Sequence, residues 1–282
     1  MQQPQGSAEI TVEAFLDNED SVDIRNPIHS TDYARRYGFR GPLVGGVTVW
    51  GWATPAILDA AGDGWLDRGW SEFVFRQPVY PGDRLRVRVR LDVDRSAGAF
   101  SVTMTNQDGV DCITATVGLG DAAWLGELSV PARIEGASAP DPRPALLLET
   151  APISQDLTPM ATPFSLQDAR DYLRLSQRTS DPRFVGDRPR LHPGWLAGRV
   201  EELLRHHFSP PSSMQTRSKV QHLARAEPGQ TVTTAARMID AYEHKGHHIG
   251  VFDCVILGET GTKLAQIRHT TIFRIALPAD RR

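Results

Sequence analysis

The sequence predicts an α+β protein built from two copies of one module, in which an antiparallel sheet wraps around a central helix. Three observations predict this fold class: the chain length, an internal repeat, and the order of helix-like and strand-like segments. The chain has 282 residues, enough for one large domain or for two domains of about 140 residues. An internal repeat within this length favours two copies of one module over a single large domain.

The repeat is clearest at two Pro-Gly pairs that each come before a strand-like run. Pro81-Gly82 is followed by alternating apolar residues, and Pro228-Gly229 is followed by a second β-prone run. Both pairs are typical of a turn that opens a strand, and the two prolines are 147 residues apart (228 − 81). The same offset aligns Arg36-Tyr37 with Arg183-Phe184, Pro42 with Pro189, and Val44 with Leu191. Several matches in the same order indicate a duplicated module.

Each copy contains one apolar helix followed by several strands. The helices are predicted over residues 47–61 and 193–207, and hairpin turns over 106–109 and 258–261. Strands are predicted at 73–78, 85–91, 100–105 and 110–117 in the first copy, and at 232–239, 250–257 and 264–275 in the second. One long helix followed by an antiparallel meander implies a sheet curled around that helix.

The two copies are joined by a proline-rich segment. Residues 131–163 hold seven of the 20 prolines in the chain. Proline at this density prevents a regular helix and favours an extended connector. We therefore predict an N-terminal module over residues 1–130, a linker over 131–159, and a C-terminal module over 160–282.

The strand predicted at 85–91 has two chemically different faces. Four arginines, at positions 84, 86, 88 and 90, alternate with apolar residues at 85, 87, 89 and 91. Alternate side chains of a strand point to opposite faces of the sheet. We interpret the arginines as a solvent-exposed face above a core face. The alternative is a basic strip that binds a coenzyme phosphate.

Composition excludes several function classes. Lys plus Arg number 31 against 34 Asp plus Glu, which argues against a nucleic-acid binder because such proteins carry a basic excess. No apolar run approaches the roughly 18–20 residues of a membrane-spanning helix, and residues 1–6 lack the features of a signal peptide. Cys112 and Cys254 lack metal-binding spacing. We therefore expect reduced thiols in a cytoplasmic protein with no membrane partner.

The stretch most informative about function runs from Asp23 to Gly46. It contains Asn26-Pro27-Ile28-His29, then Tyr33-Ala34, then Phe39, and ends on Gly45-Gly46 before the first predicted helix. This order resembles the MaoC-like, (R)-specific enoyl-thioester hydratase/dehydratase family, over about residues 20–95. The resemblance implies a hot-dog fold, and the internal repeat extends this to a double hot-dog across nearly the whole chain.

The resemblance also implies site residues, and the sequence departs from the family pattern at several of them. His29 matches the catalytic histidine, but the position of the catalytic aspartate holds Ile24, with Asp23 one residue away. The second motif aspartate is displaced by one residue, to Asp32, and the histidine that opens the central helix is replaced by Gly45. At the offset of 147, Gly45 corresponds to His192 (45 + 147).

Hydration or dehydration beside a thioester carbonyl needs a proton-transfer group and stabilisation of an enolate oxygen. Histidine suits proton transfer near neutral pH, so we predict that His29 is the acid and base. Asn26, and Asp23 or Asp32, are expected to orient His29 or the attacking water. The alternative interpretation of His29 is a loop residue that bonds to the backbone.

The start of the first central helix is the predicted binding site for the substrate carbonyl. Glycine before a helix leaves free backbone N–H groups, so the amides around Gly45, Gly46 and Val47 are expected to hold the carbonyl oxygen. His192 precedes Pro193, so we expect it to face a cleft between the modules and bind substrate, or else to be structural. The tryptophans of both helices, including Trp195, are interpreted as core or, alternatively, as the lining of an acyl tunnel.

No metal or other cofactor is expected, because the histidine-rich stretch 244–248 lacks a complete ligand pattern. The predicted partner is an acyl thioester of coenzyme A or of an acyl-carrier protein. Two other hypotheses remain open: a lyase, isomerase or cyclase of divergent chemistry on the same scaffold, and a non-catalytic protein that binds acyl or other hydrophobic ligands. A double hot-dog already pairs two modules, so a monomer and a homodimer are both compatible with the sequence.

Overall fold

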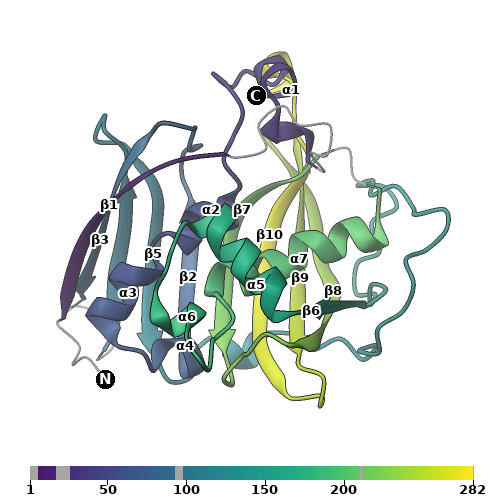
Figure 1. Cartoon of the computed structure of the whole chain (residues 1–282). Helices are drawn as coiled ribbons and strands as arrows, with labels where there is room; N and C mark the ends of the chain where they lie inside the picture. The colour runs from purple at the N-terminus through teal and green to yellow at the C-terminus, as the bar shows by residue number, and fades with distance from the viewer. Residues whose placement is uncertain (1–5, 17–25, 93–97, 210–211, 282) are drawn as a thin grey trace.

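A single ten-stranded antiparallel sheet runs through the protein (Figure 1). The computed structural model describes residues 6–16, 26–92, 98–209 and 212–281. The strand order is β1-β3-β4-β5-β2-β7-β10-β9-β8-β6, so strands β1–β5 form one half of the sheet and β6–β10 the other. The α+β class with a double hot-dog arrangement, predicted from the repeat and the motif, is therefore what this part of the chain forms.

The two halves meet at β2 and β7, which pair from Trp70 opposite Gln221 to Val74 opposite Arg217. The first half contains β1 (Ser7–Glu13), β2 (Gly69–Phe75), β3 (Arg84–Leu91), β4 (Phe100–Thr105) and β5 (Asp111–Leu119). The second contains β6 (Met160–Phe164), β7 (Met214–His222), β8 (Gln230–His244), β9 (His247–Leu257) and β10 (Lys263–Arg274). Because the backbone ladder is continuous across this join, the halves share one sheet.

The alternation in β3 gives the two faces that the sequence predicts. Leu85, Val87 and Val89 are fully buried, whereas the arginines between them are exposed or partly exposed. Glu9 on β1 lies 2.6 Å from Arg88 and 3.8 Å from Arg86. The arginines therefore lie on a solvent face, as the first interpretation expects, and two of them, Arg86 and Arg88, pair with Glu9 across the ladder.

The seven predicted strands are all present, with ends shifted by a few residues, and three strands were missed. β1 and β6 are the two edge strands, and β6 contains Pro163, which only an edge strand tolerates. β7 was missed because it buries polar residues, among them Gln215 and Ser218, and so lacks an apolar alternation. The sequence pattern could not identify a strand whose buried side is polar.

The second central helix is α7 (Pro193–His207), with the bounds the sequence predicts. The first is interrupted: α2 (Gly46–Gly51) and α3 (Thr54–Ala61) are separated by two residues, just before Pro55. Proline cannot donate the hydrogen bond that would join the two pieces. The shorter helices are α1 (Thr31–Arg36), α4 (Trp65–Arg68), α5 (Leu166–Tyr172), α6 (Pro182–Val185), a π-helical turn (Leu173–Gln177), and three 3₁₀ turns, Pro27–His29, Leu125–Glu127 and Pro278–Asp280. None of the helices in the described residues has the length and apolar character needed to cross a membrane.

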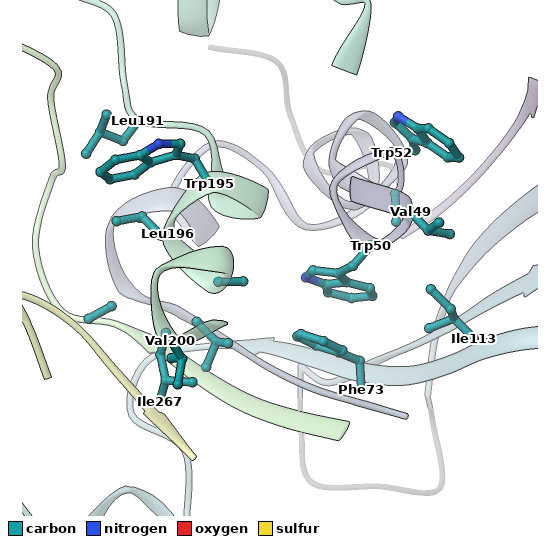
Figure 2. Packing of buried hydrophobic residues seen from close by; sticks show 14 of the residues in the cluster. Val49, Trp50, Trp52, Phe73, Ile113, Leu191, Trp195, Leu196, Val200 and Ile267 are labelled. Atoms are coloured by element: carbon teal, nitrogen blue, oxygen red, sulfur yellow. The ribbon is translucent and has the colours of Figure 1, made fainter. Parts of the chain in front are cut away.

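The helices α2 and α7 lie side by side against one face of the sheet (Figure 1). A Cβ placed on Gly194 of α7 would stand 3.1 Å from the Val47 carbonyl oxygen and 3.2 Å from the Gly51 Cα, so this contact requires glycine. Beneath the helices, Trp50 stacks on Phe73 of β2 with ring centroids 4.4 Å apart (Figure 2). The central helices therefore pack backbone to backbone over one continuous core.

The segment 131–159 contains no helix or strand. It nevertheless packs on the second half, because Leu146 and Leu157 are buried and the Ala137 carbonyl oxygen lies 3.0 Å from Nε2 of His206 on α7. The exact boundaries of the modules stay a prediction.

Candidate functional site

A cavity of about 750 Å³ lies between the two halves, and both contribute to its wall. The first half provides the turn that contains Asn26 and His29, residues 43–49 at the start of α2, and residues 75–79 after β2. The second half provides one side of α7, residues 213–216 at the start of β7, and the side chains of Phe164 and Tyr172. A ligand in this space touches both copies of the module.

His29 stands in this wall with a defined tautomer. Its Nδ1 lies 2.6 Å from the carbonyl oxygen of Leu43. Because a carbonyl oxygen only accepts hydrogen bonds, Nδ1 carries the proton and Nε2 is left with its lone pair. The Cε1–Nε2 edge of the ring faces Gly45, lying 3.7 and 4.0 Å from where a Cβ on that residue would stand. Among the described residues, no hydrogen-bond partner occupies Nε2.

The surroundings of His29 favour its neutral form. Burial lowers the pKa of the imidazole below the ordinary 6.5, and the hydrogen bond to Leu43 offsets only part of this. The positive charge of Arg205 lowers the pKa further, while the negative charge of Glu201 raises it. At neutral pH the ring is therefore uncharged and able to accept a proton at Nε2.

Gly45, Gly46 and Val47 line the cavity beside His29. Gly45 is the N-cap of α2, and Gly46 and Val47 are its first two residues, so their N–H groups have no acceptor one turn earlier in the helix. A Cβ on Gly46 would lie 2.9 Å from the Phe75 ring, so the wall is close-packed here. The structure brings these three predicted residues together with His29.

Asn26 also lines the cavity, but its amide is bound to the protein. Its Nδ2 donates to the Ser213 carbonyl oxygen at 2.8 Å, and its Oδ1 accepts from the Ser213 N–H at 3.4 Å. Ser213 lies just before β7, in the second half of the protein. The Asn-Pro-x-His turn of the first half is therefore anchored on the second.

Glu201, which no sequence pattern identified, lines the same cavity from α7. Its Oε2 accepts from the Ser213 hydroxyl at 2.6 Å and from the Arg205 guanidinium at 3.1 Å. Its Oε1 lies 2.9 Å from Nε2 of His269, a residue that is fully buried on β10. The sequence pattern predicted only an apolar helix over residues 193–207. The partners come from distant segments, so no local signal could have identified Glu201.

A chain of hydrogen bonds continues from Glu201 through His269 and Ser218 to Gln215. The Nδ1 of His269 lies 3.0 Å from the Ser218 hydroxyl, which accepts from the Gln215 side-chain amide at 2.8 Å. Gln215 lines the cavity, and its side-chain oxygen Oε1 is buried without a hydrogen-bond partner among the described residues. Polar residues of β7 and β10 thus connect two points of the cavity wall through the interior.

The carboxyl of Glu201 is held in its charged form. Burial raises its pKa, but the hydrogen bond from His269, the charges of His269 and Arg205 and the Ser213 hydroxyl together outweigh burial and hold the pKa well below its ordinary value. A carboxylate with so low a pKa takes up a proton poorly. It is suited to fixing the groups around it and to acting as a permanent negative charge.

Two predicted aspartates differ in where they lie. Asp23, like Ile24, lies outside the described residues. Asp32 is exposed on α1 and does not line the cavity, so the structure does not bring it together with His29. The displacement of this aspartate by one residue places it on the outer side of a helical turn.

His192 does not line the cavity. It is buried at the N-cap of α7, where its Nδ1 accepts from the Gly194 N–H at 3.2 Å, and its ring contacts Phe184 at 4.7 Å between centroids. Burial lowers its pKa to about 3. The structure thus places His192 as a helix cap, the structural alternative, outside the lining of the cavity.

Two other sequence hypotheses concern a metal site and the tryptophans of the central helices. In the described residues no three His, Cys, Asp or Glu side chains are placed to hold a metal ion. Trp50 and Trp52 are core residues, whereas Trp195 lines the cavity and packs on Phe164 with centroids 3.9 Å apart. The acyl-tunnel alternative therefore has support at Trp195 alone among these three.

No family model matches the sequence, and no curated protein matches it. Solved structures do match. A putative MaoC domain protein dehydratase from Chloroflexus aurantiacus is 12% identical with a TM-score of 0.64, covering 88% of this chain and 87% of that one. A conserved hypothetical protein from Mycobacterium tuberculosis with a double hot-dog fold is 13% identical with a TM-score of 0.56, covering 88% and 86%.

A third structure, a putative oleoyl thioesterase from Lactobacillus plantarum, is 11% identical with a TM-score of 0.54, covering 96% of this chain and 97% of that one. At these identities the likeness concerns the arrangement of the backbone. It agrees with the ten-stranded sheet, the two central helices, and the resemblance of the Asn-Pro-x-His segment. The chain therefore has the double hot-dog fold, in common with structures of MaoC-like dehydratases.

Proposed function

We propose that the protein hydrates an enoyl thioester, or dehydrates the corresponding 3-hydroxyacyl thioester, with His29 as acid and base. The observation that carries this proposal is the state of His29. Its Nδ1 proton is fixed on the Leu43 carbonyl, and its Nε2 is unpartnered within the described residues, in the wall of a cavity of about 750 Å³. A neutral imidazole with a free nitrogen is the form that a general base needs.

The proposed reaction needs one site of proton transfer. In hydration, a water oxygen bonds to C3 of the enoyl group while Nε2 of His29 removes one of its protons. The electrons of the C2–C3 double bond move toward the thioester carbonyl, which gives an enolate. The imidazolium then returns the proton to C2, so that one water has been added and His29 is neutral again. Dehydration follows the same steps in reverse.

The enolate oxygen needs hydrogen-bond donors where its charge develops. We place it at the amides of Gly46 and Val47, which lie in the cavity wall beside His29 and lack acceptors within α2. The positive end of the helix backbone adds to this stabilisation. In this scheme Asn26 holds the turn in place, exposed Asp32 takes no part, and a role for Asp23 stays a prediction.

The charged side chains of the wall support a thioester on a phosphorylated carrier. Coenzyme A and acyl-carrier protein both present phosphopantetheine. Among the described residues, Arg76, Arg199, Arg205 and Arg281 line the cavity, against Glu201 and Glu202. This excess of positive charge favours an anionic ligand, since arginine pairs well with phosphate oxygens. Apolar Phe164 and Trp195 provide a surface for the acyl chain.

The test is a hydration assay with short-chain trans-enoyl-coenzyme A, followed by the loss of the ultraviolet absorbance of the conjugated thioester. His29→Ala is expected to lower kcat by at least about 10²-fold, the usual contribution of acid–base catalysis. The matched control is His244→Ala, because His244 is exposed at the end of β8 and does not line the cavity. Unchanged turnover in folded His29→Ala contradicts the role of His29.

A second candidate is hydrolysis of the thioester, and the observation in its favour is the carboxylate of Glu201 in the cavity wall. The low pKa of Glu201 makes it a weak base, so we rank hydrolysis second. Release of free coenzyme A thiol, with the double bond retained, identifies hydrolysis. Binding of acyl-coenzyme A without either reaction identifies a ligand-binding protein, and isomerised or cyclised products identify divergent chemistry.

A further inference from the structure

We propose that Glu201 is a positioning residue, which holds the His29 turn of the first half in place from the second half through Ser213 and Asn26. The inference rests on the proposed role of His29, and it adds a residue of the opposite module to that site. It explains how a reactive turn is kept in position although its aspartate positions are altered.

A short series of hydrogen bonds connects Glu201 to the His29 turn. Oε2 of Glu201 accepts from the Ser213 hydroxyl at 2.6 Å, and the Ser213 backbone exchanges hydrogen bonds with the Asn26 amide at 2.8 and 3.4 Å. Asn26 immediately precedes the 3₁₀ turn Pro27–His29. Two residues, Ser213 and Asn26, therefore connect the Glu201 carboxylate to the backbone that carries the imidazole.

Glu201 is itself rigidly held. Arg205, one helical turn further along α7, donates to Oε2 at 3.1 Å, and a second guanidinium nitrogen donates to the Ser213 hydroxyl at 2.6 Å. His269 holds Oε1 at 2.9 Å. Both carboxylate oxygens are thus engaged by groups from three elements, α7, β10 and the segment before β7. A network with this many charge-assisted bonds fixes geometry, because each bond constrains the next.

The same carboxylate also acts on His29 electrostatically. Among the described residues, the charged groups that act on the imidazole are Arg205, which lowers its pKa, and Glu201, which raises it. The two charges therefore offset each other around the imidazole. Removal of one of them changes the proton affinity of Nε2 as well as the position of the turn, which separates this role from a purely structural one.

The experiment compares Glu201→Gln with Glu259→Gln, whose side chain is exposed in the turn between β9 and β10. Histidine NMR in the full-length protein measures the pKa of His29 and the Nδ1 proton bonded to Leu43. Loss of the negative charge in Glu201→Gln is expected to lower the pKa of His29, and Glu259→Gln to leave it unchanged. The acid limb of the hydration rate should move to lower pH, with kcat reduced by up to about 10²-fold, the cost of a misplaced catalytic group.

Ser213→Ala provides a second test if Glu201→Gln does not fold. It keeps the bonds of Glu201 to His269 and Arg205 and removes the hydroxyl that bridges Glu201 and Arg205 to Ser213, so it should speed solvent exchange of the His29 Nδ1 proton. The proposal is overturned if folded Glu201→Gln leaves the pKa of His29 unchanged, or if Ser213→Ala leaves the exchange unchanged. These readouts need no substrate. A protein that turns over no thioester but shows them contradicts the proposed reaction and supports the positioning role.

Discussion

The stability of this protein should depend steeply on pH in mildly acidic solution, because two histidines are buried in neutral form. Burial lowers the pKa of His192 to about 3 and that of His222 to about 4, from an ordinary value of 6.5. His192 is 4% exposed and His222 1% exposed. Since their folded pKa lies below the unfolded value, both contributions are fully present above pH 6.5. They are lost as the pH falls, because only the unfolded chain then takes up the proton.

The magnitude follows from the interval between pH 6.5 and the pH of the experiment. Each unit of pH in this interval removes about 1.4 kcal/mol of stability per histidine, so at about pH 5 each has removed roughly 2 kcal/mol. This value hardly depends on the folded pKa, which lies below pH 5 for both residues. Together they remove roughly 4 kcal/mol, a large part of a typical net stability of about 5–15 kcal/mol.

His192→Asn isolates one of the two contributions. Asparagine retains the capping of α7, and it does not titrate. The free energy of unfolding is measured by urea titration at about pH 7.5 and about pH 5 in the parent and the variant. The variant should lose roughly 2 kcal/mol less between these pH values. His244→Asn, at an exposed position, should lose as much as the parent. An equal loss in His192→Asn and the parent refutes the assignment of a buried neutral His192.

Two further substitutions test a close helix contact beside the cavity and a buried ion pair outside it. Gly194→Ala should destabilise the protein by about 1–3 kcal/mol in urea titration, because its Cβ would stand 2.7 Å from the Tyr172 hydroxyl and 3.1 Å from the Val47 carbonyl oxygen. Gly64→Ala, with nothing within 4 Å, is the control, and equal effects contradict the close helix contact. Arg268→Met should cost about 3–5 kcal/mol, because it leaves the fully buried Asp253 without its cation at 2.7 Å. Adding Asp253→Asn should recover part of this loss, and no recovery argues against an unpaired charge as its cause.

The parts of the fold that the sequence predicts are those with local patterns. β3 alternates strictly between arginine and apolar residues, α7 begins at Pro193 after its cap, and the two Pro-Gly pairs adopt left-handed glycine conformations, with φ of 83° at Gly82 and 89° at Gly229. Each pattern extends over a few residues and concerns one element. Such elements can be assigned without knowledge of their neighbours, because the physics that determines them is local.

Sequence patterns report local structure, so they predict only those residues of the candidate site that belong to one continuous segment. His29, Gly45, Gly46 and Val47 belong to one motif and lie together in the cavity wall. Glu201 becomes part of the site only through Ser213 and His269, residues on other elements that the fold brings together. Buried polar side chains such as Gln215 leave β7 without an apolar alternation, so no pattern predicts this strand. The same side chains form the chain of hydrogen bonds in the interior. Buried polar networks are satisfied by tertiary contacts, and these leave no periodic trace in the sequence.

The offset of 147 residues aligns the starts of the two central helices and shows that the two copies begin these helices differently. Gly45 and His192 occupy equivalent positions, each the N-cap of a central helix. At Gly45 the missing side chain leaves room for the Cε1–Nε2 edge of His29, and the first turn of α2 lines the cavity. At His192 an imidazole fills the same position and itself caps α7. The second copy therefore has a helix start capped by a buried imidazole, and its helix lines the same cavity with Gly194, Trp195 and, further along, Glu201. The two copies line one cavity with different residues; in the proposed function the first supplies the turn that carries His29 and the second its support.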